Sequence, residues 1–224
     1  MYYDLSLKPI TNSTKIRILE VAIELFSKNG YSGSSIRDIT KEVGIKESSL
    51  YKHFKNKEEI LDTIFSNFQL QTDTLLPPML MLDQIAKTMS LKQFLERGIE
   101  NFLAHINNQT VQQIWRIMYI ELFRHSKAQN IYHNGIMKRT IDCLELVFEK
   151  MIQQGKMAAI HPRTMATEYQ HASISLILEY NMHLNEGKST EEIMEKINNH
   201  VEFFSLLASK GAASNEYSRN AENN

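Results

Sequence analysis

The chain has 224 residues, of which 42% are hydrophobic and 23% are charged, and its formal net charge is -1. This composition is typical of a globular protein with one or two domains, and it excludes a polypeptide that is basic throughout. The single cysteine, Cys143, excludes an intrachain disulfide and a metal site built from cysteines alone. Its position in the apolar stretch IDCLELVF favours a small buried residue over a reactive thiol.

The first ten residues, MYYDLSLKPI, contain two charged residues and no apolar segment of signal-peptide length. No part of the chain approaches the ~18 consecutive apolar residues that suggest a membrane-spanning helix. We therefore expect a cytoplasmic protein with no membrane partner. Residues 1–12 are expected to form a loose arm before the first helix.

Helical periodicity dominates the chain, and the alternating pattern of strands is nearly absent. Apolar residues spaced by three and four predict a first helix that ends at Asn29-Gly30. Ser35 and Asp38 resemble a capping box at the start of a second helix, which Gly44 ends. Leu50 and Phe54 mark the inner face of a short third helix.

Asn56 and Glu59 form another capping pair, and they open a strongly amphipathic helix that fades before Pro77-Pro78. Beyond the prolines the pattern predicts further helices at 91–106, 109–124, 127–154, 163–186 and 190–208. The prediction is an all-α protein with about nine helices.

The segment from Tyr31 to Lys57 indicates a function. It predicts two short helices joined by a glycine-containing turn, which is helix-turn-helix geometry, with the second helix entering a DNA major groove. Residues 11–57 carry nine Lys or Arg against five Asp or Glu, a local charge of +4 in a chain that is neutral overall. A local basic surface is what contact with phosphates requires. Lys57 is expected to hold a phosphate at a helix N-terminus.

Two adjacent short helices are also common in all-α proteins that bind no DNA, but these residues resemble a family. The segment ILEVAIELFSKNGYSGSSIRDITKEVGIKESSLYKHFKNKEEIL is similar to the N-terminal DNA-binding region of the TetR family of bacterial transcriptional regulators. The matching elements are Ala22-x-x-Leu25-Phe26, Gly30-Tyr31, Ile36-Arg37-Asp38-Ile39, Val43-Gly44-Ile45, Leu50-Tyr51-x-x-Phe54 and Lys57-Glu58-Glu59.

This resemblance predicts which residues face double-stranded DNA with a palindromic operator. They are Ser34, Ser35, Arg37, Lys46, Glu47, Ser48, Ser49, Tyr51, Lys52, His53 and Lys57. The family often has Ser-x-Gly-Thr where this chain has Lys46-Glu47-Ser48-Ser49. The acidic Glu47 and the additional side chain of Ser48 leave the operator sequence open.

The resemblance implies a helix-turn-helix domain at 1–58 and a helical domain at 59–209 that dimerises and usually binds a small molecule. The small, polar residues at 210–224 predict a flexible tail. Two recognition helices on one palindrome require a dimer. The apolar stripes of the last two helices suggest the homodimer interface, with the alternative that they pack inside their own domain. The interface residues expected are Tyr169, Ala172, Leu176, Tyr180, Ile193, Ile197, Val201 and Phe204.

The middle helices are rich in methionine and aromatic residues, which line adaptable apolar pockets but are more often plain core. The candidate pocket residues are Phe102, His105, Trp115, Met118, Tyr119, Met137, Tyr169, Ile174 and Leu178. His105, His125 and His171 are candidates for orienting a polar group of a ligand.

The leading hypothesis is a homodimeric repressor that a small apolar or amphipathic ligand releases from its operator. One alternative is a DNA-binding regulator that a protein partner controls, or that nothing controls. Another is an enzyme on a helical scaffold. Against the enzyme, the sequence has no phosphate-binding glycine loop, no nucleophile elbow and no metal-spaced histidine pair. We therefore expect no catalytic residues, no cofactor and no metal site.

Overall fold

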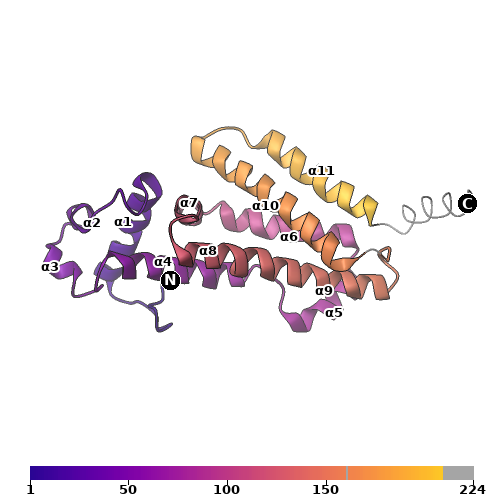
Figure 1. The fold of residues 1–224 in the computed structure, drawn as a ribbon, viewed down its shortest axis with the longest axis horizontal. Coiled ribbons are helices and arrows are strands. Elements are labelled where there is room, and N and C mark those ends of the chain that lie inside the picture. Colours follow the sequence, from indigo (N-terminus) through magenta and orange to yellow (C-terminus); the bar gives the residue numbers. More distant parts are fainter. Residues whose placement is uncertain (160, 209–224) are drawn as a thin grey trace, which may run out of the picture. The chain divides into compact units, whose positions relative to one another are not determined.

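The structure is a computed structural model that describes residues 1–159 and 161–208 (Figure 1). In these residues the chain forms helices α1 to α11, a 3₁₀ turn and a π-helical stretch, and no β-strand, so the all-α prediction is confirmed. Within the same ranges, no helix is both long enough and apolar enough to span a bilayer. The expected tail at 210–224 lies outside the described residues.

The chain divides into two compact units, which are described separately here. Unit 1 comprises Met1–Thr74 and His105–Gly135. Unit 2 comprises Leu75–Ala104 and, from Ile136 onward, the rest of the described chain. This grouping differs from the division at residues 58 and 59 that the sequence suggested, because α4 and α7 both pack against α1.

Unit 1 contains the following helices: α1 (Ser13–Asn29), α2 (Ile36–Val43), α3 (Glu47–Leu50), α4 (Lys57–Asp73), α7 (Gln109–Glu121) and α8 (Ser126–Asn130). Its core combines aliphatic side chains with four fully buried aromatic ones, Phe26, Phe65, Phe68 and Trp115. The rings of Phe68 and Trp115 meet edge to face with centroids 5.2 Å apart. Figure 1 shows α1, α2 and α3 gathered near the N-terminal end of α4.

The first twelve residues are not the loose arm expected from the sequence. The Asn67 side chain of α4 accepts a hydrogen bond from the Tyr3 amide and donates one to the Tyr3 carbonyl, both at 2.7 Å. Tyr3 and Pro9 form an isolated antiparallel bridge, and Ile10 is buried. The sequence pattern missed this arrangement because it depends on one buried amide 64 residues away.

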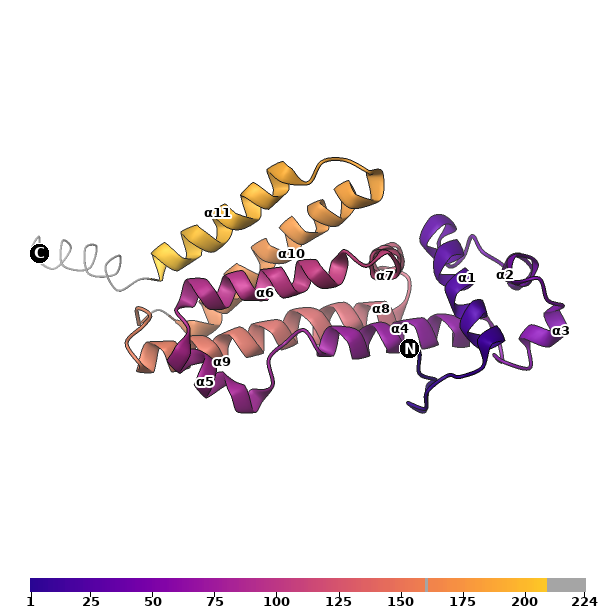
Figure 2. The ribbon, with the colours of Figure 1, turned by 180° about the vertical axis from the view of Figure 1, so that it is seen from behind.

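Unit 2 is built around α9 (Arg139–Gln153), α10 (Pro162–Glu186) and α11 (Glu191–Leu207). α10 packs against both of the others, and it lies beside α11 in both views (Figures 1 and 2). α6 (Leu91–Ile106) has most of its length in this unit. The prediction for 163–186 and 190–208 is confirmed to within one residue at most ends, because Pro162 and Gly187 set the ends of α10.

Two features of the helix order were not predicted. The η1 turn (Met79–Met81) and α5 (Leu82–Thr88) follow the proline pair, and α5 packs on α9. The single helix expected at 127–154 is instead α8, a π-helical stretch η2 (Ile131–Lys138) and α9. Gly135, a poor helix former, lies inside the π-helical stretch.

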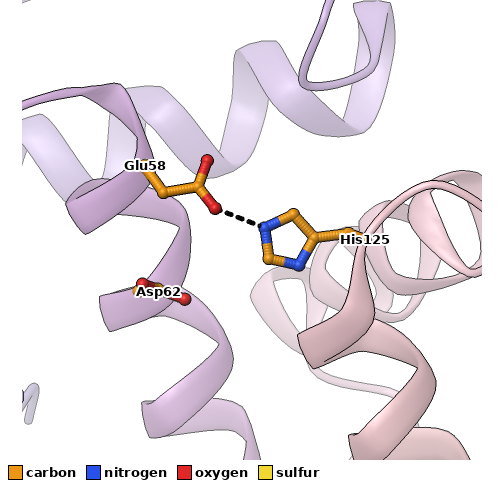
Figure 3. A group of neighbouring side chains, drawn as sticks. All are labelled: Glu58, Asp62 and His125. Atoms are coloured by element: carbon orange, nitrogen blue, oxygen red, sulfur yellow. Dashed lines mark hydrogen bonds and ion pairs between the residues drawn. The ribbon is translucent and has the colours of Figure 1, made fainter.

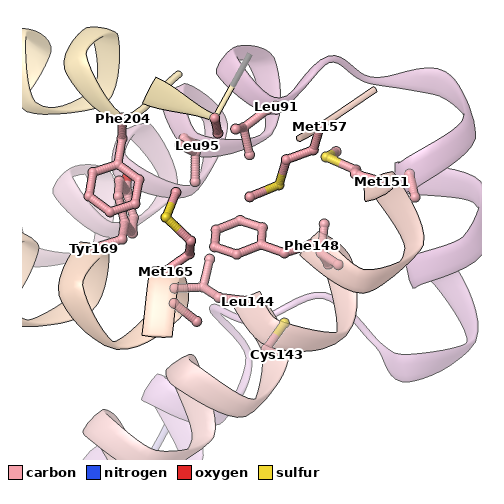
Figure 4. Close-up of a cluster of buried hydrophobic side chains, with 14 of the residues drawn as sticks. Leu91, Leu95, Cys143, Leu144, Phe148, Met151, Met157, Met165, Tyr169 and Phe204 are labelled. Carbon is pink, nitrogen blue, oxygen red and sulfur yellow. The ribbon is translucent and has the colours of Figure 1, made fainter. Parts of the chain in front are cut away.

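The core of unit 2 is an apolar cluster centred on Phe148 of α9 (Figure 4). Around it lie Met151, Met157 and Met165, whose unbranched side chains fill irregular space. Cys143 belongs to this cluster, and burial raises the pKa of its thiol to about 11. The prediction of a small buried residue at this position is confirmed.

Candidate nucleic-acid interface

The helix-turn-helix is formed by α2, a glycine turn and α3. The predicted capping box is present, because the Ser35 hydroxyl accepts from the Asp38 amide and the Asp38 carboxylate accepts from the Ser35 amide. Gly44 ends α2 in the left-handed region, with φ 78° and ψ 33°. Its amide and that of Ile45 both donate to the Thr40 carbonyl at 3.0 Å, which turns the chain sharply into α3.

The inner face of this motif is anchored as predicted. Ile39, Leu50 and Phe54 are almost completely buried, while Val43 and Ile45 are half-buried. α1 packs against α2, and α2 packs against α3. α3 is therefore held by its apolar side, which leaves its other side exposed to solvent.

The helix expected to enter the major groove, α3, is shorter than the set of predicted DNA-facing residues from Lys46 to His53. α3 covers Glu47–Leu50, and the next residues form a tight turn in which the His53 amide donates to the Leu50 carbonyl at 2.8 Å. The exposed residues of this segment are Lys46, Glu47, Ser48, Tyr51 and Lys52, whereas Ser49 and His53 are half-buried.

At the start of α2, the structure places the three predicted DNA-facing residues differently. Ser34 is only 2% exposed, and its hydroxyl donates to the Gly30 carbonyl at 3.1 Å. Its side chain is therefore part of the turn and does not face DNA, which corrects the prediction. Ser35 is exposed, although its hydroxyl serves the capping box, and Arg37 is exposed on α2.

Lys57 is not the free phosphate clamp expected from the sequence. Its ammonium group donates to the carbonyls of Tyr31 at 2.9 Å and Ser34 at 2.8 Å. It also lies 4.1 Å from the centroid of the Tyr31 ring. Because an ammonium has three donors, these contacts leave one N–H for another acceptor. Lys57 mainly ties the start of α4 to the turn before α2.

A set of polar contacts that the sequence did not predict joins this motif to α7 and to His125, the residue before α8. The Tyr31 amide donates to the buried Glu121 carboxylate at 3.0 Å, and the Tyr31 hydroxyl donates to Glu58 at 2.7 Å. The other Glu58 oxygen lies 2.8 Å from His125 Nε2 (Figure 3). Burial and the Glu58 hydrogen bond raise the pKa of Tyr31, and that hydrogen bond lowers the pKa of Glu58. The paired residues are 67 and 90 positions apart in the sequence, so no local pattern predicts these contacts.

The candidate pocket residues fall into both units. His105, Trp115, Met118 and Tyr119 belong to unit 1, and the rings of Trp115 and Tyr119 lie 5.6 Å apart. In unit 2, by contrast, Tyr169 lies in the apolar core. The other candidates in unit 2 are Phe102, Met137, Ile174 and Leu178, of which Met137 and Ile174 are buried.

Most of the predicted dimer residues lie inside their own unit. Tyr169, Val201 and Phe204 belong to the apolar cluster of unit 2, and Tyr180, Ile193 and Ile197 are also buried. These side chains are not available to a partner, so the alternative that the stripes pack internally holds for them. Of the predicted set, Ala172 is exposed and Leu176 is half-buried.

Comparison with known proteins shows that the N-terminal part of the chain is similar to a family of regulators. Residues 18–64 match the family model described as bacterial regulatory proteins, tetR family. A relative from Staphylococcus epidermidis, the biofilm operon icaADBC HTH-type negative transcriptional regulator IcaR, is 54% identical over 46 residues. That match covers 20% of this chain and 25% of the relative, so the chain spans about a quarter of the length of this relative.

Solved structures resemble most of the chain. A putative TetR-family transcriptional regulator from Mesorhizobium loti has a TM-score of 0.62 at 16% identity, covering 88% of this chain and 96% of its own. A putative transcriptional regulator from Saccharomonospora viridis, solved in complex with choline, has a TM-score of 0.58 at 20% identity, covering 85% and 94%. At these identities the likeness concerns the fold. Residues 18–64 are therefore similar to the tetR family of bacterial regulatory proteins, and the fold of most of the chain is similar to that of the solved regulators.

Proposed function

We propose that this protein is a DNA-binding transcriptional regulator that acts as a repressor. The observation that carries the proposal is the exposed face of α3 and the turn after it, on a helix held by Leu50 and Phe54. The matched relative is a negative regulator by name. In the proposed complex, Ser48 and Glu47 meet base edges, while Tyr51 and the flanking lysines contact phosphates.

The test is binding of the full chain to the DNA upstream of its own gene and neighbouring genes, measured by fluorescence anisotropy over a range of salt concentrations. Replacing Lys46 and Lys52 by alanine should weaken binding on all sequences and reduce the slope of log K against log salt by about 0.9 per lysine. Lys188→Ala, on an exposed loop of unit 2, is the matched control. Unchanged affinity in the double variant would overturn the assignment of this surface.

The proposal includes a homodimer formed through the outer faces of α10 and α11. Phe203, Leu206 and Leu207 are 62%, 60% and 42% exposed, and their spacing places them on one side of α11. Large exposed apolar side chains grouped in this way are typical of an interface. This surface replaces the buried stripe that the sequence suggested.

Light scattering after gel filtration tests the dimer. Phe203→Glu together with Leu206→Glu should convert the dimer to a monomer, because each added charge would be buried without a partner. Glu195→Lys, at an exposed position of the same helix, is the control for charge alone. A monomeric wild-type protein would remove this part of the proposal.

The proposed effector site lies in unit 1, around Trp115 and Tyr119 of α7. The Nε2 atom of His105 and the hydroxyl of Tyr119 are buried and have no hydrogen-bond partner among the described residues. Burial lowers the pKa of His105 and raises that of Tyr119, so both are neutral near pH 7. Neutral, unpartnered polar atoms such as these suit a small amphipathic ligand with one or two polar groups.

A ligand there would contact α7, which packs against both α1 and α4. It can shift DNA affinity only if it binds the free and DNA-bound conformations differently. A thermal-shift screen of amphipathic compounds, followed by anisotropy with DNA, tests this. Tyr119→Phe and His105→Leu should weaken ligand binding while DNA binding without ligand is kept. If hits bind both variants as tightly as the wild type, the site lies elsewhere.

A further inference from the structure

Three side chains from distant parts of the sequence meet beside the helix-turn-helix, all within unit 1. Glu58 and Asp62 are one turn apart on α4, and His125 precedes α8 (Figure 3). Each offers one ligand atom, and these atoms all lie within 4.8 Å of one another. We propose that Glu58, Asp62 and His125 form a binding site for a divalent transition-metal ion of the zinc type.

The donor set selects this class of ion. Two carboxylates and one imidazole suit Zn²⁺ and its first-row neighbours, whereas Ca²⁺ and Mg²⁺ prefer all-oxygen sites. Around a tetrahedral zinc with bonds of about 2.1 Å, neighbouring ligand atoms lie roughly 3.4 Å apart. The observed spacing reaches that value by side-chain rotation, since positions i and i+4 of a helix share one face.

The ring nitrogen that faces the site is defined. His125 Nε2 points at Glu58 at 2.8 Å, while Nδ1 is buried and has no hydrogen-bond partner in the described part of the chain. The His125 side chain is 13% exposed and that of Glu58 is 50% exposed. An ion therefore reaches Nε2 from the solvent side, and it would take the place of the Nε2–Glu58 contact.

Two neighbouring side chains affect ion binding in opposite ways: Tyr31 orients a ligand carboxylate, and Lys127 competes for another. The Tyr31 hydroxyl donates to one Glu58 oxygen at 2.7 Å, so it orients the carboxylate while the second oxygen faces His125. The Lys127 ammonium lies 3.0 Å from an Asp62 carboxylate oxygen. It also donates to the Asp62 carbonyl and the Ser66 hydroxyl, at 3.0 and 3.1 Å, so it can keep those partners when an ion takes the carboxylate.

Titration of the full chain with Zn²⁺ by calorimetry, and with Co²⁺ by absorption spectroscopy, tests the site. We expect one ion per chain. The d–d absorption bands of bound Co²⁺ should differ between the wild type and His125→Gln, because the variant lacks the nitrogen ligand. His125→Gln and Glu58→Gln should weaken binding by at least the 10- to 100-fold that changes outside the ligand set commonly cost. Tyr31→Phe, which loses only the orienting hydroxyl, should weaken it by about tenfold.

His171→Gln is the control, because His171 is exposed on α10 in unit 2. It should bind the ion as the wild type does. Circular dichroism shows whether each variant is folded, and Asp62→Asn provides a third ligand change if one of the others is not. Absence of saturable binding, or equal affinity in all ligand variants, would overturn the proposal.

A consequence for DNA binding rests on the proposed function, whereas the ion site itself does not. A bound ion would cross-link the N-terminal end of α4 to His125, the residue before α8. This link would lie next to Tyr31, whose amide is hydrogen-bonded to Glu121 of α7. We expect Zn²⁺ to change the DNA affinity of the wild type and not that of His125→Gln. Ion binding without this change would leave the site standing and would separate it from regulation.

Discussion

The two units of this protein differ in the contacts that stabilise each of them internally. Unit 2 has a large apolar cluster around Phe148, made of residues whose helical spacing is visible in the sequence. Unit 1 also has an apolar core, but its turns are joined by polar pairs such as Tyr31–Glu121 and Glu58–His125. Apolar stripes can be read from periodicity, whereas polar pairs between distant helices require the folded chain.

Substitutions in the two cores give the largest expected effect. Phe148→Ala and Phe26→Ala each remove a fully buried ring, at a cost of about 3–5 kcal/mol. Hydrogen exchange should show loss of protection concentrated in α9–α11 for Phe148→Ala and in α1–α4 for Phe26→Ala. Equal loss over the whole chain in both variants would mean that the two units unfold as one.

Two glycines near the DNA-facing motif should differ in their response to alanine. At Gly33 a Cβ would lie 2.2 Å from the Asn29 carbonyl oxygen, so Gly33→Ala must move backbone and should cost about 2–3 kcal/mol. A Cβ added at Gly44 would have no neighbouring atom within 4 Å, but the φ of Gly44 is +78°. Gly44→Ala should therefore cost about 1–2 kcal/mol from backbone strain alone. Urea unfolding measures both, and the reverse order would contradict this account of the turn.

The Tyr31–Glu121 contact tests whether polar pairs hold unit 1 together. Glu121→Ala leaves the Tyr31 amide without its acceptor and should cost about 1–3 kcal/mol. Glu121→Gln keeps an acceptor oxygen and should cost less. Thermal unfolding compares the two variants. If both lose the same amount of stability, the contribution of Glu121 is packing and not the hydrogen bond.

The smallest effect concerns acid stability at the start of α2. Hydrogen bonds from Ser35 lower the pKa of Asp38, so the folded state favours the carboxylate. This contribution is present above the unfolded pKa of about 3.9 and is lost as pH falls through the lower, folded value. Ser35→Ala should therefore lose stability at pH 7 and show a weaker decrease between about pH 4 and pH 2. A parallel acid profile in wild type and variant would exclude this linkage.

The sequence determined much of the candidate site. Ser35 and Asp38 form the predicted capping box, Gly44 makes the predicted turn, and Leu50 and Phe54 anchor α3. These features are local, so residues a few positions apart decide them. The roles of Ser34 and Lys57 were not predictable in this way. Both side chains donate hydrogen bonds to backbone carbonyl groups of the turn before α2.

The sequence by itself determined the helical class, the helix ends set by glycine and proline, and the similarity of the N-terminal region to the tetR family. Only the tertiary structure decided which face of α10 and α11 is exposed, because two apolar stripes pack internally or externally with the same periodicity. It also decided that the N-terminal arm lies on Asn67 and that His125 meets Glu58. Those contacts join segments more than 60 residues apart, and no local pattern records them.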